Sequence, residues 1–338
     1  MPTAPKPETN PKQPLYPLLF SPDLCEKVWG GTRLRALKGL PADGNAVGES
    51  WEASALEKSP GIVAEGPLAG RTLPDLIAEY GAALTGRAAQ VDGDADFPLL
   101  VKLLDTSDTL SIQVHPDDAL ARRLSGCSGK NEMWYILEAA PDAFLYLGFQ
   151  SATTPEEIRR RALDGTNCDT LNRVKARPGD VFFIPAGCVH ALGPGLLVAE
   201  VQQSSDVTYR LFDFGRPREL HLDQALLAAD CAAFSPAPLP RTPLSAHTTR
   251  LIGNSFFTVD ELTPASPLRR SLPAGESFVI CLCIAGECII HADTAAPSPD
   301  IRLAAGRCAL LPACMAEHTL IPADSHGPTK VLEIYLAR

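Results

Sequence analysis

The sequence contains no long hydrophobic run. None of its apolar stretches approaches the roughly 20 residues that a membrane-spanning helix needs. The first residues, MPTAPKPETNPKQPLYP, are polar and rich in proline, and they lack the apolar core of a signal peptide. We therefore expect a cytoplasmic protein with no membrane partner.

An excess of positive charge is also missing. The 338 residues include 30 Lys and Arg against 40 Asp and Glu, which gives a formal net charge of −10 at pH 7. An acidic chain is a poor general binder of nucleic acid, because such binding depends on a basic surface. We expect no nucleic-acid partner, and an anionic small-molecule substrate would need a local basic pocket.

No Cys-x-x-Cys pair occurs among the ten cysteines. Because such pairs are absent and Cys281 and Cys283 share one face of an apolar strand candidate, we expect most cysteines to be reduced, small, buried side chains. Prolines, by contrast, number 31, together with 25 glycines. This density disfavours long helices and favours many short strands joined by turns.

Short apolar runs and turn signals predict a mainly β architecture. With 45% hydrophobic residues, the chain can build one large domain or two ordinary ones. Strand-like runs recur along the chain, whereas helix periodicity appears in a few short segments only. These segments are 73–81, 117–124, 154–163 and 222–230. Many antiparallel strands with tight turns are typical of a β-barrel or sandwich.

A proline-rich stretch divides the chain. Residues 235–247 begin with Ser-Pro-Ala-Pro-Leu-Pro-Arg-Thr-Pro, show no periodicity and form the predicted linker. Before it we place a disordered tail at 1–13 and a larger domain with helical segments at 14–234. After it, at 248–338, the piece LAAGRCALLPAC resembles VKARPGDVFFIPAGC in the larger domain. This similarity predicts a second barrel of the same kind.

Two side chains of one predicted strand could bind a metal ion. In Ser-Ile-Gln-Val-His, the alternation of a strand places Ser111, Gln113 and His115 on one face. Gln113 and His115 then project side by side, as chelating ligands would. The alternative is a polar strand face turned toward solvent.

A carboxylate and a second imidazole could join this pair. Glu132 begins an apolar strand, where it is either a turn residue or a ligand. His190 follows a Pro-Ala-Gly turn, where a barrel presents side chains to its cavity, although a lone histidine there is often a hydrogen-bonded core residue. Two histidines, a glutamate and a glutamine suit a divalent ion with an open position, and they favour Zn²⁺ over its competitors Fe²⁺ and Mn²⁺. His318 follows a similar turn without a preceding Gln-x-His strand or matching glutamate, so we expect a metal-free second domain.

Five linked motifs follow one another in the larger domain. They are FPLLVKLLD from 97, LSIQVHPDD from 110, GKNEMWYI from 129, PGDVFFIPAGCVHAL from 178 and EVQQSSDVTYRLFDF from 200. In order and spacing these motifs resemble type I mannose-6-phosphate isomerases, in their short bacterial form. The resemblance implies a mainly β fold of two cupin-type, jelly-roll barrels, of which the first, at 14–234, is catalytic and binds the metal.

The resemblance also implies an activity and a ligand set. Members of this family interconvert mannose 6-phosphate and fructose 6-phosphate with one zinc ion, through a cis-enediolate. The implied zinc ligands of this chain are Gln113, His115, Glu132 and His190. These are the four residues that the strand pattern brings together.

Further family positions fall on charged residues. The functional arginine falls on Arg210, with Asp206 four residues before it, and the family's lysines fall on Lys102 and Lys130. Where longer members have a histidine directly before the second lysine, this chain has Gly129. That difference removes one proton-transfer group and leaves the catalytic base open.

Isomerisation needs an electrophile, a proton carrier and cations for the phosphate. Arg210 and Lys130 can supply positive charge near the enediolate or the phosphate, and Lys102 can complete the anion pocket. Ser111, on the face of Gln113, is a further substrate-binding candidate. The candidate proton carriers are Lys130, Glu200 and Asp206.

Two other functions remain open from the sequence. One is an iron-dependent cupin oxygenase, although Gln113 stands where that class has the first histidine of a His-x-His pair. The other is a sugar-binding or regulatory cupin without turnover, which would have less use for Arg210 and Lys130. The second barrel would cover the first or form a dimer contact, so we expect a monomer or a homodimer.

Overall fold

The computed structural model describes residues 13–41, 44–91, 94–292, 299–315, 317–323 and 327–336. Residues 1–12 of the predicted tail therefore lie outside the described residues. No helix in the described ranges has the length and apolar character needed to cross a membrane.

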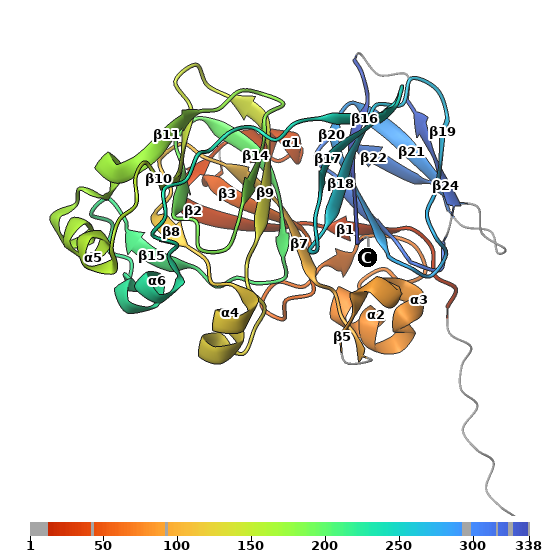
Figure 1. Ribbon diagram of the computed structural model, residues 1–338. Coiled ribbons are helices and arrows are strands. Elements are labelled where there is room, and N and C mark those ends of the chain that lie inside the picture. The colour runs from red at the N-terminus through yellow and green to blue at the C-terminus, as the bar shows by residue number, and fades with distance from the viewer. Residues whose placement is uncertain are drawn as a thin grey trace, which may run out of the picture.

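The chain folds into two cupin-type β units, which lie side by side in Figure 1. The first cupin unit pairs a six-stranded sheet with a five-stranded one. The six-stranded order β12-β9-β14-β7-β3-β2 comprises Val181–Ile184, Glu132–Ala139, Leu196–Gln203, Leu99–Asp105, Val47–Ala53 and Asp23–Gly31. The five-stranded order β11-β10-β13-β8-β15 comprises Leu171–Lys175, Phe144–Phe149, His190–Leu192, Ile112–Val114 and Tyr209–Phe212.

The second cupin unit pairs an eight-stranded sheet with a four-stranded one. The order β16-β17-β18-β25-β20-β23-β1-β4 comprises Thr242–Ser245, Thr248–Gly253, Thr258–Leu262, Lys330–Tyr335, Val279–Ala285, Cys308–Leu311, Leu18–Ser21 and Ile62–Val63. The order β19-β24-β21-β22 comprises Leu268–Ser271, Glu317–Pro322, Glu287–Ala292 and Ile301–Ala304. All pairings between these strands are antiparallel. The prediction of a mainly β, double cupin fold is confirmed.

The two units repeat one another strand by strand. The order β12-β9-β14-β7 in the first unit recurs as β23-β20-β25-β18 in the second, and β11-β10-β13-β8 recurs as β22-β21-β24-β19. Each run occupies consecutive strands of the chain, from β7 to β14 and from β18 to β25. The repeated turn motif in the sequence therefore marks a repeated arrangement of eight strands.

The domain division at 235–247 stays a prediction, but two features differ from it in detail. The early strands β1 and β4 belong to the sheet of the second unit, where β1 pairs with β23. Within the predicted linker, residues 242–245 form strand β16, which pairs with β17. A proline is tolerated in β16 because this strand lies at the edge of its sheet, where a missing N–H breaks no ladder.

One hydrophobic core joins the two units. Its largest cluster contains buried residues of both, among them Phe97 and Val101 from the first and Phe278 and Ile280 from the second. The rings of Phe97 and Phe278 lie 4.6 Å apart between centroids. Polar contacts add to this interface, since Tyr135 donates a hydrogen bond to Glu261 Oε2 at 2.6 Å.

The helices lie outside the sheets, and all four predicted segments are helical. They are α2 (Leu73–Tyr80), α4 (Asp118–Ser125), α5 (Pro155–Asp164) and α6 (Leu222–Ala228). The remaining short elements are α1 (Arg33–Leu37), α3 (Ala82–Thr85), the 3₁₀ turns Arg87–Ala89 and Asn167–Thr170, and the hairpin of β5 (Gln90–Val91) and β6 (Asp94–Ala95). Asp117 caps α4 by accepting a hydrogen bond from the Leu120 amide. In Figure 1, α5 and α6 lie together at the far end of the first unit.

All ten cysteines are free thiols, as expected. Five of them are buried, four are partly buried and Cys314 is exposed. The buried ones concentrate in the second unit, where Cys281 and Cys283 lie in β20. They serve there as small core residues.

The shared core predicts that the two units depend on each other for stability. Phe278→Ala removes a fully buried ring at their junction and should lower the free energy of unfolding by about 3–5 kcal/mol. Denaturant unfolding followed by circular dichroism measures this loss. Leu163→Ala is the control, because Leu163 is 71% exposed and its loss should change stability by less than about 0.5 kcal/mol. An unchanged midpoint for Phe278→Ala would contradict the shared core.

Candidate active site

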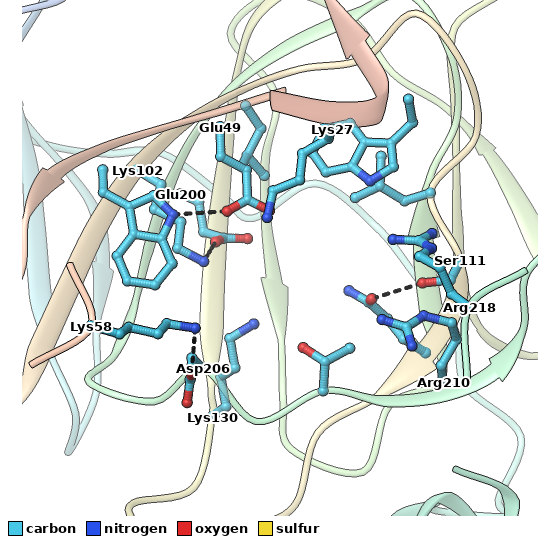
Figure 2. A pocket seen from close by; sticks show the side chains of 16 residues that line it. Lys27, Glu49, Lys58, Lys102, Ser111, Lys130, Glu200, Asp206, Arg210 and Arg218 are labelled. Atoms are coloured by element: carbon cyan, nitrogen blue, oxygen red, sulfur yellow. Dashed lines mark hydrogen bonds and ion pairs between the residues drawn. The ribbon is translucent and has the colours of Figure 1, made fainter. Parts of the chain in front are cut away.

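A pocket of about 270 Å³ opens in the first cupin unit (Figure 2). Every predicted substrate-binding and catalytic residue lines it: Lys102, Ser111, Lys130, Glu200, Asp206 and Arg210. The predicted metal ligand Gln113 lines it as well. The pocket also contains polar and charged residues that the sequence did not single out for the site: Lys27, Glu49, Lys58, Thr208 and Arg218.

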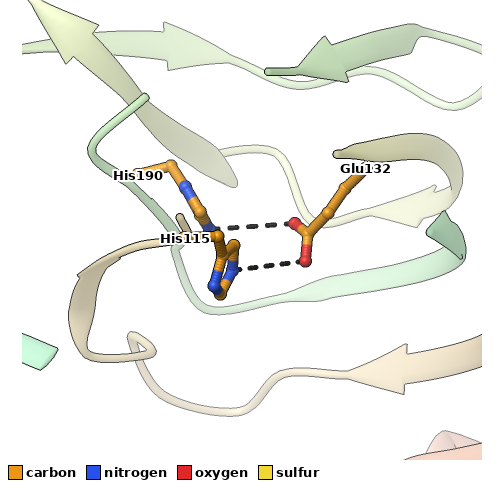
Figure 3. Close-up of side chains that lie close together, drawn as sticks. All are labelled: His115, Glu132 and His190. Atoms are coloured by element: carbon orange, nitrogen blue, oxygen red, sulfur yellow. Dashed lines mark ion pairs between the residues drawn. The ribbon is translucent and has the colours of Figure 1, made fainter. Parts of the chain in front are cut away.

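Three other predicted ligands meet behind the pocket wall (Figure 3). His115 follows β8, Glu132 begins β9 and His190 begins β13, so the two facing sheets of the unit contribute to one cluster. One ligand atom from each residue lies within 4.8 Å of the others, and all three side chains are buried. No other group of this kind occurs in the described ranges of the chain.

Backbone carbonyl groups orient the rings of the two histidines. Nδ1 of His115 lies 2.8 Å from the Val207 carbonyl oxygen, and Nδ1 of His190 lies 2.8 Å from that of Cys188. Each Nδ1–H therefore donates to a carbonyl, and each Nε2 keeps its lone pair. Both Nε2 atoms face the Glu132 carboxylate, at 3.3 and 3.8 Å. This support by backbone carbonyls is typical of metal-binding histidines.

No hydrogen bond stabilises the negative charge of the Glu132 carboxylate. Both carboxylate oxygens are buried and accept no hydrogen bond of good geometry. The Lys130 ammonium lies 2.6 Å from Glu132 Oε1 and 3.2 Å from His115 Nε2, so a cation already stands beside the cluster. A buried carboxylate without a hydrogen bond, beside two unprotonated imidazole nitrogens, fits a divalent metal ion.

The pKa shifts of His115 and Glu132 agree with this geometry. Burial, followed by the charge of Lys130, lowers the pKa of His115 to about 3, which keeps the ring neutral near pH 7. Burial by itself would raise the pKa of Glu132, but Lys130 and the two histidines hold it well below its usual range. A neutral imidazole and an ionised carboxylate are the forms that bind metals.

Gln113 stands next to the cluster but does not present its oxygen to it. Gln113 pairs with His190 across β8 and β13, and its Nε2 lies 3.4 Å from His190 Nε2. Its Oε1 accepts a hydrogen bond from Ser111 Oγ at 3.3 Å. A half-turn of the amide would exchange these two atoms and direct the oxygen at the cluster.

Each lysine of the pocket has a carboxylate of its own. The pairs are Lys27 with Glu49 at 3.3 Å, Lys58 with Asp206, Lys102 with Glu200 at 3.4 Å and Lys130 with Glu132 at 2.6 Å. Two of these lysines, Lys58 and Lys102, also contact the ring of Trp51. The lysines are therefore largely neutralised within the pocket wall.

Of the two arginines of the pocket, only Arg218 is matched in this way. Arg210 Nη1 donates to the Glu219 carbonyl at 2.7 Å, its Nε is buried without a hydrogen bond, and no carboxylate in the described part of the chain forms an ion pair with it. Arg218 donates twice to buried Asp213, at 2.6 Å each. Arg216 also pairs with Asp213, and it has Asp108 at 3.5 Å as a second carboxylate. The unmatched positive charge of the pocket thus lies on Arg210.

The structure distinguishes two of the candidate proton carriers. Glu200 is buried and accepts a hydrogen bond from Trp134 Nε1 at 2.9 Å. Burial, with the nearby charge of Glu132, raises its pKa against the opposing effect of Lys102. Asp206 is half exposed, and its ion pair with Lys58 outweighs burial and lowers its pKa.

The pocket residues that the sequence analysis did not name differ in how well local sequence could have predicted them. Glu49 and Trp51 alternate on one face of β3, so strand periodicity could have indicated that Glu49 joins Trp51 at the pocket. Arg218 lies in the irregular segment after β15, which has no periodicity to read. Lys27 reaches the pocket from β2, whose pairing with β3 shifts register twice.

The double cupin fold defines a protein of the cupin class, and the His–Glu–His cluster gives it a candidate metal site. A family model, phosphomannose isomerase type I, catalytic domain, matches residues 18–138. The chain is 37% identical to the Bacillus subtilis mannose-6-phosphate isomerase ManA over 80% of this chain and 86% of ManA. It is also 37% identical to mannose-6-phosphate isomerase of Streptococcus mutans, over 72% and 77% of the two chains.

A solved structure agrees with these relatives. The crystal structure of mannose 6-phosphate isomerase from Bacillus subtilis superposes with a TM-score of 0.82 at 33% identity, covering 96% of this chain and all of that one. A structure of the Salmonella typhimurium phosphomannose isomerase, at 18% identity and a TM-score of 0.76, shares the fold. The chain belongs to the type I mannose-6-phosphate isomerase family, as its motifs predicted.

The charge arrangement of the pocket predicts an acid-sensitive contribution of Glu49 to stability. Burial would raise the pKa of Glu49, but Lys102 and Lys27 lower it from 4.5 to about 2. Because the folded pKa is the lower one, the stabilisation is fully present above pH 4.5 and disappears as the pH falls toward about 2. Glu49→Gln should therefore lose on the order of 2 kcal/mol at about pH 7 and much less at about pH 3.

Urea unfolding at several pH values measures this difference. Glu57→Gln is the matched control, since Glu57 is exposed and outside the pocket. A deficit of Glu49→Gln that is equal at both pH values would show that the loss is not due to the charge.

Proposed function

We propose that the protein is a zinc-dependent aldose–ketose isomerase that interconverts mannose 6-phosphate and fructose 6-phosphate through a cis-enediolate. The observation that carries this proposal is the buried His115–Glu132–His190 cluster behind the wall of a cation-lined pocket, in a chain of this family. The cluster supplies a metal site, and the pocket supplies charge for a phosphorylated sugar.

His115, Glu132 and His190 would hold the ion, with Gln113 as the fourth ligand after its amide turns. Two imidazoles, one carboxylate and an amide oxygen suit Zn²⁺ with an open position for substrate oxygens. A bound zinc ion would act as a Lewis acid that polarises the C1 and C2 oxygens of the open-chain sugar. Lys130, beside Glu132, would place its ammonium near the same oxygens and stabilise negative charge that develops on them.

Glu200 is the side chain best suited to carry the proton. Its raised pKa brings it closer to the pH at which a carboxylate both accepts and returns a proton efficiently. The ionised carboxylate would take the proton from C2 of the aldose and return it to C1, while the hydroxyl proton passes from O2 to O1, which yields the ketose. Lys102 would keep Glu200 in place through their contact at 3.4 Å. Asp206 is less suited, because its pKa is lowered.

The phosphate of the sugar would lie on the arginine side of the pocket. Each of the four pocket lysines is matched by a carboxylate, and Arg218 is matched by Asp213, whereas Arg210 has no carboxylate partner in the described part of the chain. A phosphate dianion would neutralise this surplus with charge-assisted hydrogen bonds. Ser111, on the same wall, would contribute a hydroxyl to the sugar (Figure 2).

We also propose the division of labour within the chain. Residues 14–234 would form the catalytic part, and 248–338 a cupin unit without a metal, in a cytoplasmic protein that works as a monomer or a homodimer. The ten free thiols support a reducing compartment.

Removal of the metal should abolish the activity. A coupled assay with mannose 6-phosphate should show formation of fructose 6-phosphate that a chelator stops and added Zn²⁺ restores. His190→Ala should lower zinc content, measured by mass spectrometry, to less than about a tenth of the wild-type value, because it removes one of the ligands. His247→Ala, which lies outside the cluster, is the control. Full activity in metal-free protein would refute the zinc requirement.

Replacing each of the two carboxylates by its amide tests which one carries the proton. Glu200→Gln should lower kcat by about 10²–10⁴, because an amide cannot accept the C2 proton. Asp206→Asn should change kcat by less than about tenfold, since Asp206 is paired with Lys58 at the pocket rim. Exchange of the C2 deuterium of labelled substrate into solvent separates proton transfer from binding. If Asp206→Asn lost this exchange and Glu200→Gln kept it, the assignment would be reversed.

A further inference from the structure

The side chain of Lys130 contacts the metal cluster as well as the pocket. Its ammonium nitrogen Nζ lies 2.6 Å from Glu132 Oε1 and 3.2 Å from His115 Nε2. All three side chains are at most 5% exposed, and Lys130 also lines the pocket of Figure 2. Lys130 therefore stands at the boundary between the ligand cluster and the space for the substrate.

The other three pocket lysines have partners outside the cluster. These pairs are Lys27 with Glu49, Lys58 with Asp206 and Lys102 with Glu200. Of the four pocket lysines, Lys130 is the one whose ion pair is with a predicted metal ligand. Its position should therefore depend on what the ligands bind, whereas the other three positions should not.

The Lys130 ammonium engages an electron pair that a metal ion would need. Nδ1 of His115 donates its proton to the Val207 carbonyl at 2.8 Å, so Nε2 carries the free lone pair of the ring. An ammonium group has donors and no acceptor, so its contact with Nε2 at 3.2 Å uses that lone pair. A metal ion bound by His115 would take the same lone pair. The two cations therefore cannot use His115 at the same time.

Glu132 depends on Lys130 for its charge balance. The two histidines beside it are neutral, since each has a proton on Nδ1 and a lone pair on Nε2. Among the lysines and arginines of the described ranges, Lys130 is the one that forms an ion pair with Glu132. Without this ammonium, and without a metal ion, the buried carboxylate would have no cation in contact with it.

We propose that Lys130 is the internal counter-ion of the metal cluster, and that a divalent ion displaces its ammonium into the adjoining pocket. This inference rests on the proposed function, because it concerns the same metal site. The backbone of Lys130 is fixed by its N–H, which donates to the Pro116 carbonyl at 3.0 Å, so the movement is a rotation of the side chain. Metal loading would thus also deliver the charge that stabilises the reacting sugar oxygens.

A neutral side chain of similar length at this position tests the competition. Lys130→Met should bind Zn²⁺ with a dissociation constant at least about tenfold lower than that of the wild type, because no charge-assisted hydrogen bond has to be displaced. Titration of metal-free protein with Zn²⁺ against a chromophoric chelator measures this constant, at about pH 8, where an ordinary histidine is neutral.

Lys58→Met is the matched control for zinc binding. Lys58 is another lysine of the pocket, it pairs with Asp206, and its side chain is 55% exposed. Because this pair lies outside the cluster, the dissociation constant for Zn²⁺ should change by less than about threefold.

The charge balance is tested on protein without metal. Metal-free Lys130→Met should unfold at a Tm roughly 5–10 °C below that of the metal-free wild type, since Glu132 loses its cation. The double variant Lys130→Met/Glu132→Gln should recover most of this loss, because it removes the buried charge together with its partner. A lysine needed only for packing would give no such recovery. Calorimetry measures the three Tm values.

The outcomes separate this proposal from the proposed isomerase activity. Zinc binding by Lys130→Met that is equal to or weaker than that of the wild type contradicts the counter-ion role and leaves the zinc site in place. Tighter zinc binding by Lys130→Met, in a protein that does not isomerise mannose 6-phosphate, would support the counter-ion role and refute the isomerase. Zinc binding by neither protein would refute both proposals. If metal-free Lys130→Met is insoluble, a soluble double variant supports the proposal and an insoluble one contradicts it.

Discussion

The carboxylate of Glu132 is buried, and its negative charge must be compensated within the protein. Burying an ionised carboxylate without a partner costs several kcal/mol, so the surrounding residues are arranged to offset it. The Lys130 ammonium lies 2.6 Å away, and two histidines turn their unprotonated nitrogens toward the same point. The rest of the pocket, with lysines beside carboxylates, extends this pattern of compensated charge from the cluster toward the surface.

The same constraint applies in the second cupin unit, where it is met differently. The repeated strand order brings Asp260, Glu333 and His318 between two sheets, where Arg270 pairs with Glu333 and Arg250 pairs with Asp260. The two units thus share a backbone arrangement and the need for a central cation.

The shared core explains why the unit without the metal cluster is retained in contact with the first. Strand β1 of the early chain pairs into the sheet of the second unit, and Phe97 packs on Phe278 across the junction. Strand β3 lies at this junction as well, because Glu49 and Trp51 face the pocket, whereas buried Glu52 pairs with Lys38 next to the Gly306 carbonyl. The wall of the pocket is therefore supported by the second unit.

Much of this protein follows from local sequence. The proline and glycine density predicted short strands, the alternation around Ile112 predicted that Gln113 and His115 share a face, and five linked motifs identified the family. These inferences succeed because strand periodicity, turn chemistry and motif spacing are properties of neighbouring residues. Only the tertiary structure decided which lysine pairs with which carboxylate, that Arg210 has no carboxylate partner in the described part of the chain, and that Arg270 pairs with His318 as Gln113 pairs with His190. Such contacts join residues far apart in the chain, and they depend on how two sheets face each other, which no local pattern encodes.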